Sequence, residues 1–279
     1  MLSTFKSDLH CHSIFSDGSN TPEELVEIAK KIGLQGIALT DHDTFDGLER
    51  LEKTGFPVIS GAEFSSNFKD NSIHILAYSF NPKASSLREL VQEQEEKRHL
   101  RMHQILSRLN ELGFPMSLEE VLELRGDRGD HAIGRPHLAN LMLKKGFVKS
   151  REEAFHTWLG EKGKAFVSST YPESEEVIER IHAAGGLAIL AHPHLLPKGS
   201  LRKSLLNLPF DGLEGRYARM RPNQNEPWIR EGKKRGWIVT GGSDFHGAPR
   251  TDISLGNAYT DESTFKMLQA KYNTHKAAT

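Results

Sequence analysis

Short apolar runs alternate with longer stretches of helical periodicity along most of the chain. The runs that we predict to be strands are residues 8–10, 36–40, 58–60, 73–78, 187–191, 212–214 and 237–240. Parallel strands joined by crossover helices produce this alternation. The pattern therefore predicts an α/β fold, either a barrel or a layered sheet.

The first predicted helix lies between the first two strands and has a clear start signal. Thr21 is a hydroxyl N-cap, Pro22 suits the first helical position, and Glu23 and Glu24 suit the positive end of the helix dipole. Gly33 is expected to end the helix. The apolar residues that fall on one face of this helix are Leu25, Ile28, Ala29 and Ile32.

The strand signal disappears between residues 86 and 163, where helical periodicity takes over. We predict helices at residues 87–112, 117–124, 136–145 and 152–159, and another at 173–184. The turn-rich run 126–130 is expected to be a mobile connection. We therefore predict a barrel built from residues 1–85 and 164–279, with 86–163 as a helical insertion that contributes to the substrate site.

Composition favours a globular enzyme and restricts the classes of molecule that it is expected to bind. The 279 residues are 37% hydrophobic and 26% charged, and the net charge of −1 is no footprint of a generic nucleic-acid binder. Residues 125–164 carry nine basic against five acidic residues; this is a local phosphate-binding surface or simply a solvated helical face. With no long apolar run and no leader pattern, we expect a cytoplasmic protein without membrane contact, and no obligate protein partner is predicted.

A pair of histidines in the first strand is the first sign of chemistry. His10 and His12 alternate along the strand, so both point to the same side and can share a metal ion. Asp17 follows in a Ser-Asp-Gly turn. Taken alone, such a pair is more often incidental than a ligand pair. Cys11 is the single cysteine, which excludes an internal disulfide and a thiolate metal site.

Further ligand-type side chains stand at the ends of the other predicted strands. Functional groups gather at the carboxyl ends of parallel strands, so these residues are expected to converge. They are Asp41, His42 and Asp43 after the second strand, Glu63 after the third, His74 on the fourth, His192 after the fifth, and Asp244 and His246 after the last.

In these motifs the sequence resembles the PHP (polymerase and histidinol phosphatase) family. The matching segments are residues 8–12, 40–43, 191–193 and 243–246. The resemblance implies a distorted (β/α)7 barrel with a trinuclear metal site. Its nine implied ligands are His10, His12, Asp17, His42, Glu63, His74, His192, Asp244 and His246.

The same resemblance divides these ligands among three ions. His10, His12, Glu63 and Asp244 would hold the first ion. Glu63 would bridge to a second ion held with His74 and His192, and the remaining three residues would hold the third. Imidazole and carboxylate without thiolate suit Mn, Fe or Zn, so we expect two or three such divalent ions. A purely structural metal cluster is the alternative.

Charge considerations then suggest the chemistry. Neighbouring metal ions can bind phosphoryl oxygens and activate water for in-line attack, so no Ser or Cys nucleophile is needed. Asp41 is our candidate for orienting a ligand or shuttling a proton, with Asp43 as a second carboxylate of that kind.

Substrate contacts are predicted from cationic and aromatic residues. Arg135 precedes a predicted helix N-terminus, where an anion is favoured, and it resembles a phosphate-contacting arginine of the PHP subgroup acting on nucleotide bisphosphates and short RNA ends. We assign Arg135 a catalytic role as well as a binding role. The other predicted substrate-binding residues are His137, Lys164, Arg216 and Tyr217, the last as a stacking platform for a base. The alternatives are that Arg135 or Lys164 is simply exposed on the surface, and that Arg216 and Tyr217 are rim residues that merely pack.

The sequence therefore predicts a metal-dependent phosphoesterase. Its expected substrates are 3′,5′-nucleotide bisphosphates or short oligoribonucleotides cleaved from the 5′ end. A histidinol-phosphate phosphatase, and a non-catalytic metal-stabilised scaffold module, are the alternatives.

Overall fold

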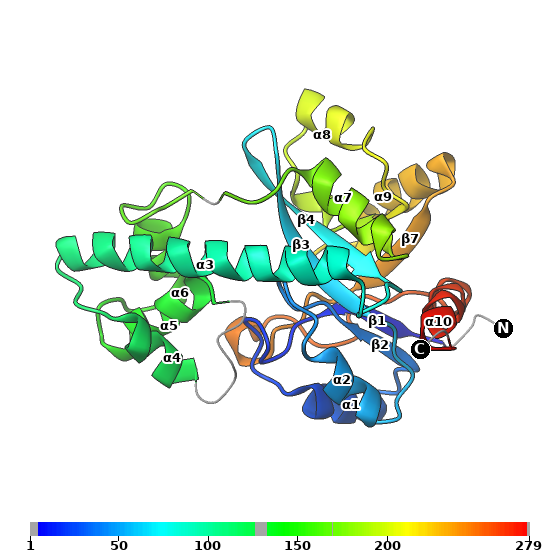
Figure 1. Ribbon diagram of the computed structural model, residues 1–279, viewed down its shortest axis with the longest axis horizontal. Helices are drawn as coiled ribbons and strands as arrows, with labels where there is room; N and C mark the ends of the chain where they lie inside the picture. The colour runs from blue at the N-terminus through cyan, green and yellow to red at the C-terminus, as the bar shows by residue number, and fades with distance from the viewer. Residues whose placement is uncertain (1–4, 126–132, 169, 278–279) are drawn as a thin grey trace. The chain divides into compact units, whose positions relative to one another are not determined.

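The computed structural model describes residues 5–125, 133–168 and 170–277 (Figure 1). The chain divides into two compact units, one formed by residues 1–91 and 172–279 and the other by residues 92–171. The second unit overlaps the predicted insertion 86–163 but has different limits. The long helix α3 (Ser85–Glu111) runs through both units, and residues after 163 join the helical core. The predicted mobile connection 126–130 lies outside the described residues.

Among the described residues, seven strands form the core of the first unit. They are β1 (Ser7–Cys11), β2 (Gly36–Leu39), β3 (Gly61–Phe68), β4 (Asn71–Tyr78), β5 (Leu187–Leu190), β6 (Gly212–Tyr217) and β7 (Ile238–Gly242). β1 pairs with β2, and β3 to β7 form a second sheet in sequence order. Isolated bridges join the two sheets, from His42 to Glu63 at one edge and from Cys11 to Phe245 at the other. The result is an irregular, closed α/β barrel, the class that the alternation predicts.

The region around β3 and β4 departs from the expected pattern of parallel strands. β3 and β4 form an antiparallel hairpin whose turn residues Lys69 and Asp70 have φ angles of 51° and 63°, and β5 is antiparallel to β4. Positive φ at both central residues is the conformation that matches strand twist in a tight hairpin. The prediction of parallel strands is therefore wrong for β4.

The position of β3 was also predicted wrongly. We expected a strand at residues 58–60, but there Val58 makes only an isolated bridge to Ile37. The strand begins at Gly61 and contains Glu63, two serines and an asparagine. Residues 56–59 are apolar because they pack in the core, and this apolar run is what predicts a strand there. The actual strand is polar and is stabilised by backbone pairing with β4 along its whole length.

Helices surround the barrel. Those of the first unit are α1 (Pro22–Lys31), α2 (Leu48–Lys53), α7 (Ser174–Ala183), α8 (Ser200–Leu205), α9 (Pro222–Arg235) and α10 (Glu262–Ala277). The predicted start of α1 is confirmed, because Thr21 and Glu24 form a capping box with Pro22 in the first turn. Ile32 is an exception to the predicted apolar face; the helix ends at Lys31, and Ile32 is 49% exposed.

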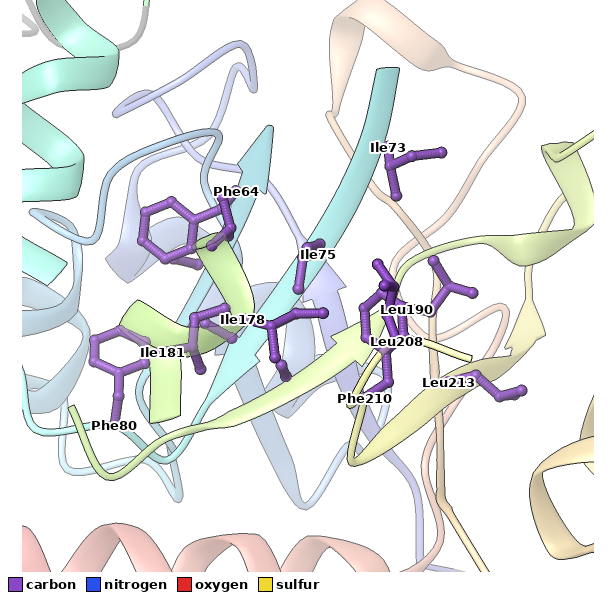
Figure 2. Close-up of a cluster of buried hydrophobic side chains, with 14 of the residues drawn as sticks. Phe64, Ile73, Ile75, Phe80, Ile178, Ile181, Leu190, Leu208, Phe210 and Leu213 are labelled. Atoms are coloured by element: carbon purple, nitrogen blue, oxygen red, sulfur yellow. The ribbon is translucent and has the colours of Figure 1, made fainter. Parts of the chain in front are cut away.

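Two apolar layers fix the strands. Side chains on the outer face of β3 to β6, such as Phe64, Ile75 and Leu190, pack against α7 residues Ile178 and Ile181 (Figure 2). The second layer contains Leu76, Tyr78 and Ile189 and is covered by α10. Because strand neighbours alternate between faces, His74 shares the face of Leu76 and Tyr78, at the other end of β4. The metal-ligand candidates are thus carried by well-packed strands.

The second unit is helical and has its own core. Beside the end of α3 it contains α4 (Leu118–Arg125), α5 (Arg135–Lys144), α6 (Arg151–Glu153) and a π-helical segment (Ala154–Leu159). The predicted helices of this region are confirmed, the last as α6 followed by the π-helical segment. Within the described parts of the chain, we find no helix with the length and apolar character needed to cross a membrane.

Candidate metal centre

Nine histidine and carboxylate side chains meet in the barrel unit. β1 and the residues after it supply His10, His12 and Asp17, and His42 follows β2. Glu63 lies on β3 and His74 on β4, and the segments after β5 and β7 supply the rest. The last three are His192, Asp244 and His246. The structure thus brings together all nine ligands that the resemblance implies, although their role as ligands remains a prediction.

Glu63 is the centre of this cluster. Its Oε1 lies 2.8 Å from His74 Nδ1 and 2.9 Å from His192 Nε2. Its Oε2 lies 3.2 Å from His42 Nδ1 and 3.3 Å from His12 Nε2. The side chain is 1% exposed. A buried carboxylate that presents its two oxygens to different imidazoles is suited to join two ion-binding positions.

Asp244 and Asp17 anchor the two other parts of the cluster. Asp244 Oδ1 lies 3.2 Å from His12 Nε2 and 3.5 Å from His10 Nε2. Asp17 Oδ1 lies 3.2 Å from His246 Nε2. In each case a carboxylate oxygen faces imidazole nitrogens, which is the arrangement that a shared cation requires.

The donor atoms fit a group of cations. Several buried side-chain atoms have no hydrogen-bond partner among the described residues, which is costly unless something else binds them. In the cluster these are His10 Nε2, His12 Nε2, Asp17 Oδ1, His42 Nδ1 and His246 Nε2. Buried imidazole and carboxylate donors without thiolate suit divalent Mn, Fe or Zn.

The donors fall into three overlapping sets, each within 4.8 Å. One set is His10, His12, Glu63 and Asp244, which coincides with the first implied ion site. A second set joins His12 to Asp17, His42 and His246. A third joins His42, Glu63 and His74, while His192 contacts Glu63 directly. The cluster could therefore hold more than one ion.

The electrostatics of the cluster keep its carboxylates charged. Burial favours the neutral acid, but His74 and His42 outweigh burial and hold the pKa of Glu63 well below its usual value. Burial likewise disfavours protonated His12, yet the carboxylates of Asp244 and Glu63 raise its pKa to about 9.

The other histidines of the cluster do not all behave alike. Burial also opposes a charge on His10, but Glu214 and Glu63 raise the pKa of His10 well above its usual value. Burial holds the pKa of His42 well below its usual value. Without metal, protons on His10 and His12 thus help to balance the buried negative charge.

Glu214 supports two of the predicted ligands, and sequence reasoning missed it. This fully buried residue of β6 accepts a hydrogen bond at 2.9 Å from His10 Nδ1 and another at 2.8 Å from the backbone N–H of His192. A carboxylate behind a histidine fixes the ring orientation and tautomer and strengthens it as a ligand. The available signal was an acidic residue in an otherwise apolar predicted strand.

Arg250 was also missed. Its Nη1 lies 2.6 Å from Asp244 Oδ2, which also accepts a hydrogen bond from the Tyr217 hydroxyl at 2.9 Å. Burial alone would raise the pKa of Asp244, but Arg250 and the nearby histidines hold it well below its usual value. Arg250 lies in a turn-rich segment whose sequence carries no periodicity, so nothing in the pattern connected it with the site.

Asp41 holds the loop that follows β1. Its carboxylate accepts hydrogen bonds from the Ser13 backbone at 2.7 Å, the Ser13 hydroxyl at 2.6 Å and the Ser16 hydroxyl at 2.5 Å. Asp43 accepts one from the Ser65 backbone at 2.6 Å. This geometry suits the orienting role predicted for Asp41, because the loop carries Asp17; proton transfer by Asp41 remains a prediction.

The backbone at the cluster is unusual. Asp43, His192 and Asp244 have φ angles of 53°, 25° and 56°. Non-glycine residues rarely adopt such angles, and they concentrate where a site requires them. A Cβ on Gly242 would lie 2.4 Å from the His10 backbone nitrogen, so the end of β7 approaches β1 as closely as glycine permits.

The predicted substrate-binding residues belong to both units. In the barrel unit, Arg216 lies 3.9 Å from Asp261, and Tyr217 is 2% exposed with its ring against His192 and His194. The Tyr217 ring is thus packed against these two histidines, and the stacking of Tyr217 on a base remains a prediction.

In the helical unit, Arg135 is the first residue of α5 and donates to the Leu159 carbonyl at 3.1 Å. His137 Nδ1 accepts from the Gly134 N–H, and Lys164 lies over the Trp158 ring. Burial and the like charge of Arg101 lower the pKa of Arg135.

Comparisons with known proteins agree with this site. The PHP domain model matches residues 8–186. The chain is 33% identical to a 5′-3′ exoribonuclease of Haemophilus influenzae over 87% of this chain and 90% of that protein. It is 30% identical to a phosphoribosyl 1,2-cyclic phosphate 1,2-diphosphodiesterase of Eggerthella lenta, covering 86% of this chain and 94% of that one. It is 27% identical to a 3′,5′-nucleoside bisphosphate phosphatase of Chromobacterium violaceum, covering 86% of each.

A solved structure has the same fold. It is described as a putative metal-dependent phosphoesterase of Bifidobacterium adolescentis, with 30% identity and a TM-score of 0.88 over 96% of this chain and 97% of that one. An α/β barrel with this buried cluster of imidazoles and carboxylates defines a metal-dependent phosphoesterase, a hydrolase of phosphoric esters. The chain belongs to the PHP domain family, as its four motifs indicated.

Proposed function

We propose that this protein hydrolyses phosphate esters of nucleotides, either 3′,5′-nucleoside bisphosphates or short RNA cleaved from its 5′ end. The observation that carries the proposal is the buried cluster around Glu63, in which five donor atoms lack a hydrogen-bond partner within the described structure. Relatives named as an exoribonuclease and as a nucleoside bisphosphate phosphatase support the nucleotide class.

The side chains of the cluster have separable roles in this proposal. Divalent cations, when bound there, supply Lewis acidity toward the phosphoryl group and activate water for attack on phosphorus. Glu63 would join the ion positions through its two oxygens, and Glu214 would keep the His10 ring in one orientation. Asp41 would hold the loop that carries Asp17. None of these roles needs a serine or cysteine nucleophile.

We also propose that Arg135 binds a phosphate of the substrate. Two observations within the helical unit support this role. Arg135 occupies the N-terminus of α5, where backbone N–H groups favour an anion. Its pKa is lowered by burial and by Arg101, so an anionic ligand would relieve an unfavourable concentration of positive charge. His137 and Lys164 of the same unit remain proposed contacts.

The test is a substrate panel with the Mn²⁺-loaded protein. Adenosine 3′,5′-bisphosphate, a 5′-phosphorylated oligoribonucleotide, a 1,2-cyclic ribosyl phosphate, histidinol phosphate and an aryl phosphate are compared by kcat/KM. We expect one of the first two to rank highest. Highest turnover of histidinol phosphate, or no turnover with metal fully bound, would contradict the proposal and favour the phosphatase or scaffold alternative.

Two variants separate chemistry from recognition. Asp244→Asn removes a ligand charge and should reduce kcat for every substrate by about a hundredfold or more, as expected when several kcal/mol of transition-state stabilisation is lost. Arg135→Ala should reduce kcat/KM for phosphorylated nucleotides more than for the aryl phosphate. If Arg135→Ala lowers kcat/KM equally for every substrate of the panel, the proposed role of Arg135 in substrate recognition is wrong.

A further inference from the structure

A cavity of about 860 Å³ opens in the barrel unit beside the segment that follows His192. Its walls come from the short helix Pro193–Leu195 after β5, from α8 and from α9. The volume lies within the range of pockets that enclose a small organic ligand. Nothing in the metal chemistry described above uses this cavity.

The cavity has a strong surplus of positive charge. Lys198, Arg202, Lys203 and Arg235 line it, and Glu231 is the one acidic lining residue. Glu231 is already paired with Arg235 at 2.6 Å. Among the described residues, the other three cations have no carboxylate within ion-pair distance. The walls therefore favour an anion.

Arg202 is held in place for such a ligand. Its guanidinium lies 5.0 Å from the centre of the Trp228 ring and donates to the Leu196 carbonyl, while its Nε is buried without a hydrogen-bond partner in the described structure. A buried donor without a partner is costly, so an acceptor bound in the cavity would satisfy it. The ring contact and the carbonyl bond restrict Arg202 and reduce the entropy lost on binding.

The remaining wall is apolar. Leu206, Met220 and Pro227 line the cavity together with the Trp228 ring. An inorganic anion would leave these surfaces uncovered, whereas a ligand with both a phosphate and a planar ring system would use both parts. A nucleotide has this combination of groups.

A line of rings connects the cavity with the metal centre. Tyr217 contacts His192 at 5.6 Å and His194 at 5.8 Å between ring centroids, and His194 contacts Trp228 at 5.7 Å. Tyr217 also donates to Asp244 of the cluster. His194 lines the cavity, so the His194 and Tyr217 rings link the cavity to the cluster.

We propose that this cavity binds the part of a nucleotide substrate that lies beyond the scissile phosphate, namely its base and a second phosphate. This inference rests on the proposed function. It restricts the substrate class to phosphate esters that carry an additional charged nucleotide part, and it disfavours histidinol phosphate, whose free amine would meet Lys198, Arg202 and Lys203.

The first experiment measures binding without catalysis. The metal-free protein is titrated calorimetrically with AMP, adenosine and inorganic phosphate. We expect AMP to bind more tightly than either fragment. Lys203→Glu should weaken AMP binding about tenfold, the scale of one lost hydrogen bond to a charged group. Lys234→Glu is the matched control, because Lys234 is exposed on α9 and does not line the cavity.

The second experiment connects the cavity with turnover. With Mn²⁺ present, Lys203→Glu should lower kcat/KM for adenosine 3′,5′-bisphosphate about tenfold more than kcat/KM for the aryl phosphate. Lys198→Glu should do the same, and Lys234→Glu should leave the ratio of the two substrates at the wild-type value.

The outcomes separate the two proposals. If the bisphosphate is turned over but the Lys203→Glu and Lys234→Glu proteins show the same substrate ratio, the cavity proposal is wrong and the proposed function stands. If AMP binding weakens while the substrate ratio is unchanged, the cavity holds a separate nucleotide, which also overturns the substrate assignment. If neither nucleotide substrate is turned over, the proposed function itself fails.

Discussion

At the scale of single residues, the predicted metal ligands depend on supporting residues that no metal-binding sequence motif contains. Glu214 orients His10, and Arg250 balances the charge of Asp244. Both lie behind predicted ligands and determine how strongly those ligands can bind. Substitutions at these two positions are therefore informative about the site without removing a donor atom.

Arg250→Gln is expected to weaken metal binding. Arg250 is the strongest of the charges that hold the pKa of Asp244 down, so its loss makes Asp244 easier to protonate and a poorer ligand. We expect about a tenfold increase in the Kd for Mn²⁺, corresponding to one lost charged hydrogen bond. Metal titration followed by activity measures this effect.

The matched control is Arg219→Gln, because Arg219 forms a more exposed ion pair with Asp252 at 3.6 Å. It should bind Mn²⁺ like the wild type. Activity of Arg250→Gln that recovers at high Mn²⁺ would support the charge-balancing role. A variant with unchanged Mn²⁺ affinity would contradict it.

The predicted ligands were accessible to sequence reasoning because they follow strands, and the ends of strands in a barrel converge. His10, His42 and Asp244 are recognisable in this way. Glu214 and Arg250 could not be recognised from the sequence, because their importance comes from contacts between segments distant in sequence. A single charged residue in a strand or a turn does not reveal its partner.

At the scale of elements, the site depends on how closely β7 approaches β1. The Asp244 N–H donates to the His10 carbonyl at 2.7 Å, and the His12 N–H donates to the Phe245 carbonyl at 2.8 Å. Gly242 makes this approach possible because it has no Cβ. The distance between the first and last strands therefore sets the positions of ligands on both.

Gly242→Ala is expected to displace His10 and to destabilise the fold. The added methyl group would overlap the His10 backbone, and such overpacking costs about 1–3 kcal/mol. Metal content should fall together with the melting temperature. Both are measured on the purified variant by elemental analysis and thermal unfolding.

Gly236→Ala is the control for a general glycine effect. Gly236 has a φ of 69°, and a methyl group at this position would meet no other atom within 4 Å, so the substitution strains only the end of α9. It should cost about 1 kcal/mol and leave metal content unchanged. Equal metal loss in both variants would show that the close contact at Gly242 is not what positions His10.

Sequence patterns located most helices but misplaced β3. Helices such as α1 are recognisable from their caps and a 3.6-residue period, which are local properties. β3 is polar because Glu63 faces the cluster and its serines and asparagine are satisfied by neighbouring segments. Its stability comes from pairing with β4, which no local window of sequence contains.

At the scale of the whole molecule, metal binding and proton binding compete for the same buried cluster. In the absence of metal, burial opposes the charge on His12, but neighbouring carboxylates raise its pKa to about 9. At pH 7 this imidazole is therefore protonated. A cation must displace that proton before His12 can act as a ligand.

We expect Mn²⁺ affinity to rise with pH through about 9, because His12 must lose its proton to act as a ligand and the pKa of His10 is also raised. Calorimetry in buffers of different ionisation enthalpy should show at least one proton released per protein at pH 7. Replacing His12 by Asn should reduce the number of protons released. Binding at pH 7 without proton release would contradict a protonated metal-free cluster.

The arrangement of ligands along the chain has a consequence for biosynthesis. His10 leaves the ribosome with β1, whereas Asp244 and His246 follow only after β7 has been translated. A nascent chain can form α1 and the helical unit early, but it cannot complete the cation cluster. With the proposed set of ligands, we expect hydrolytic activity to begin only after the last strand has closed against the first.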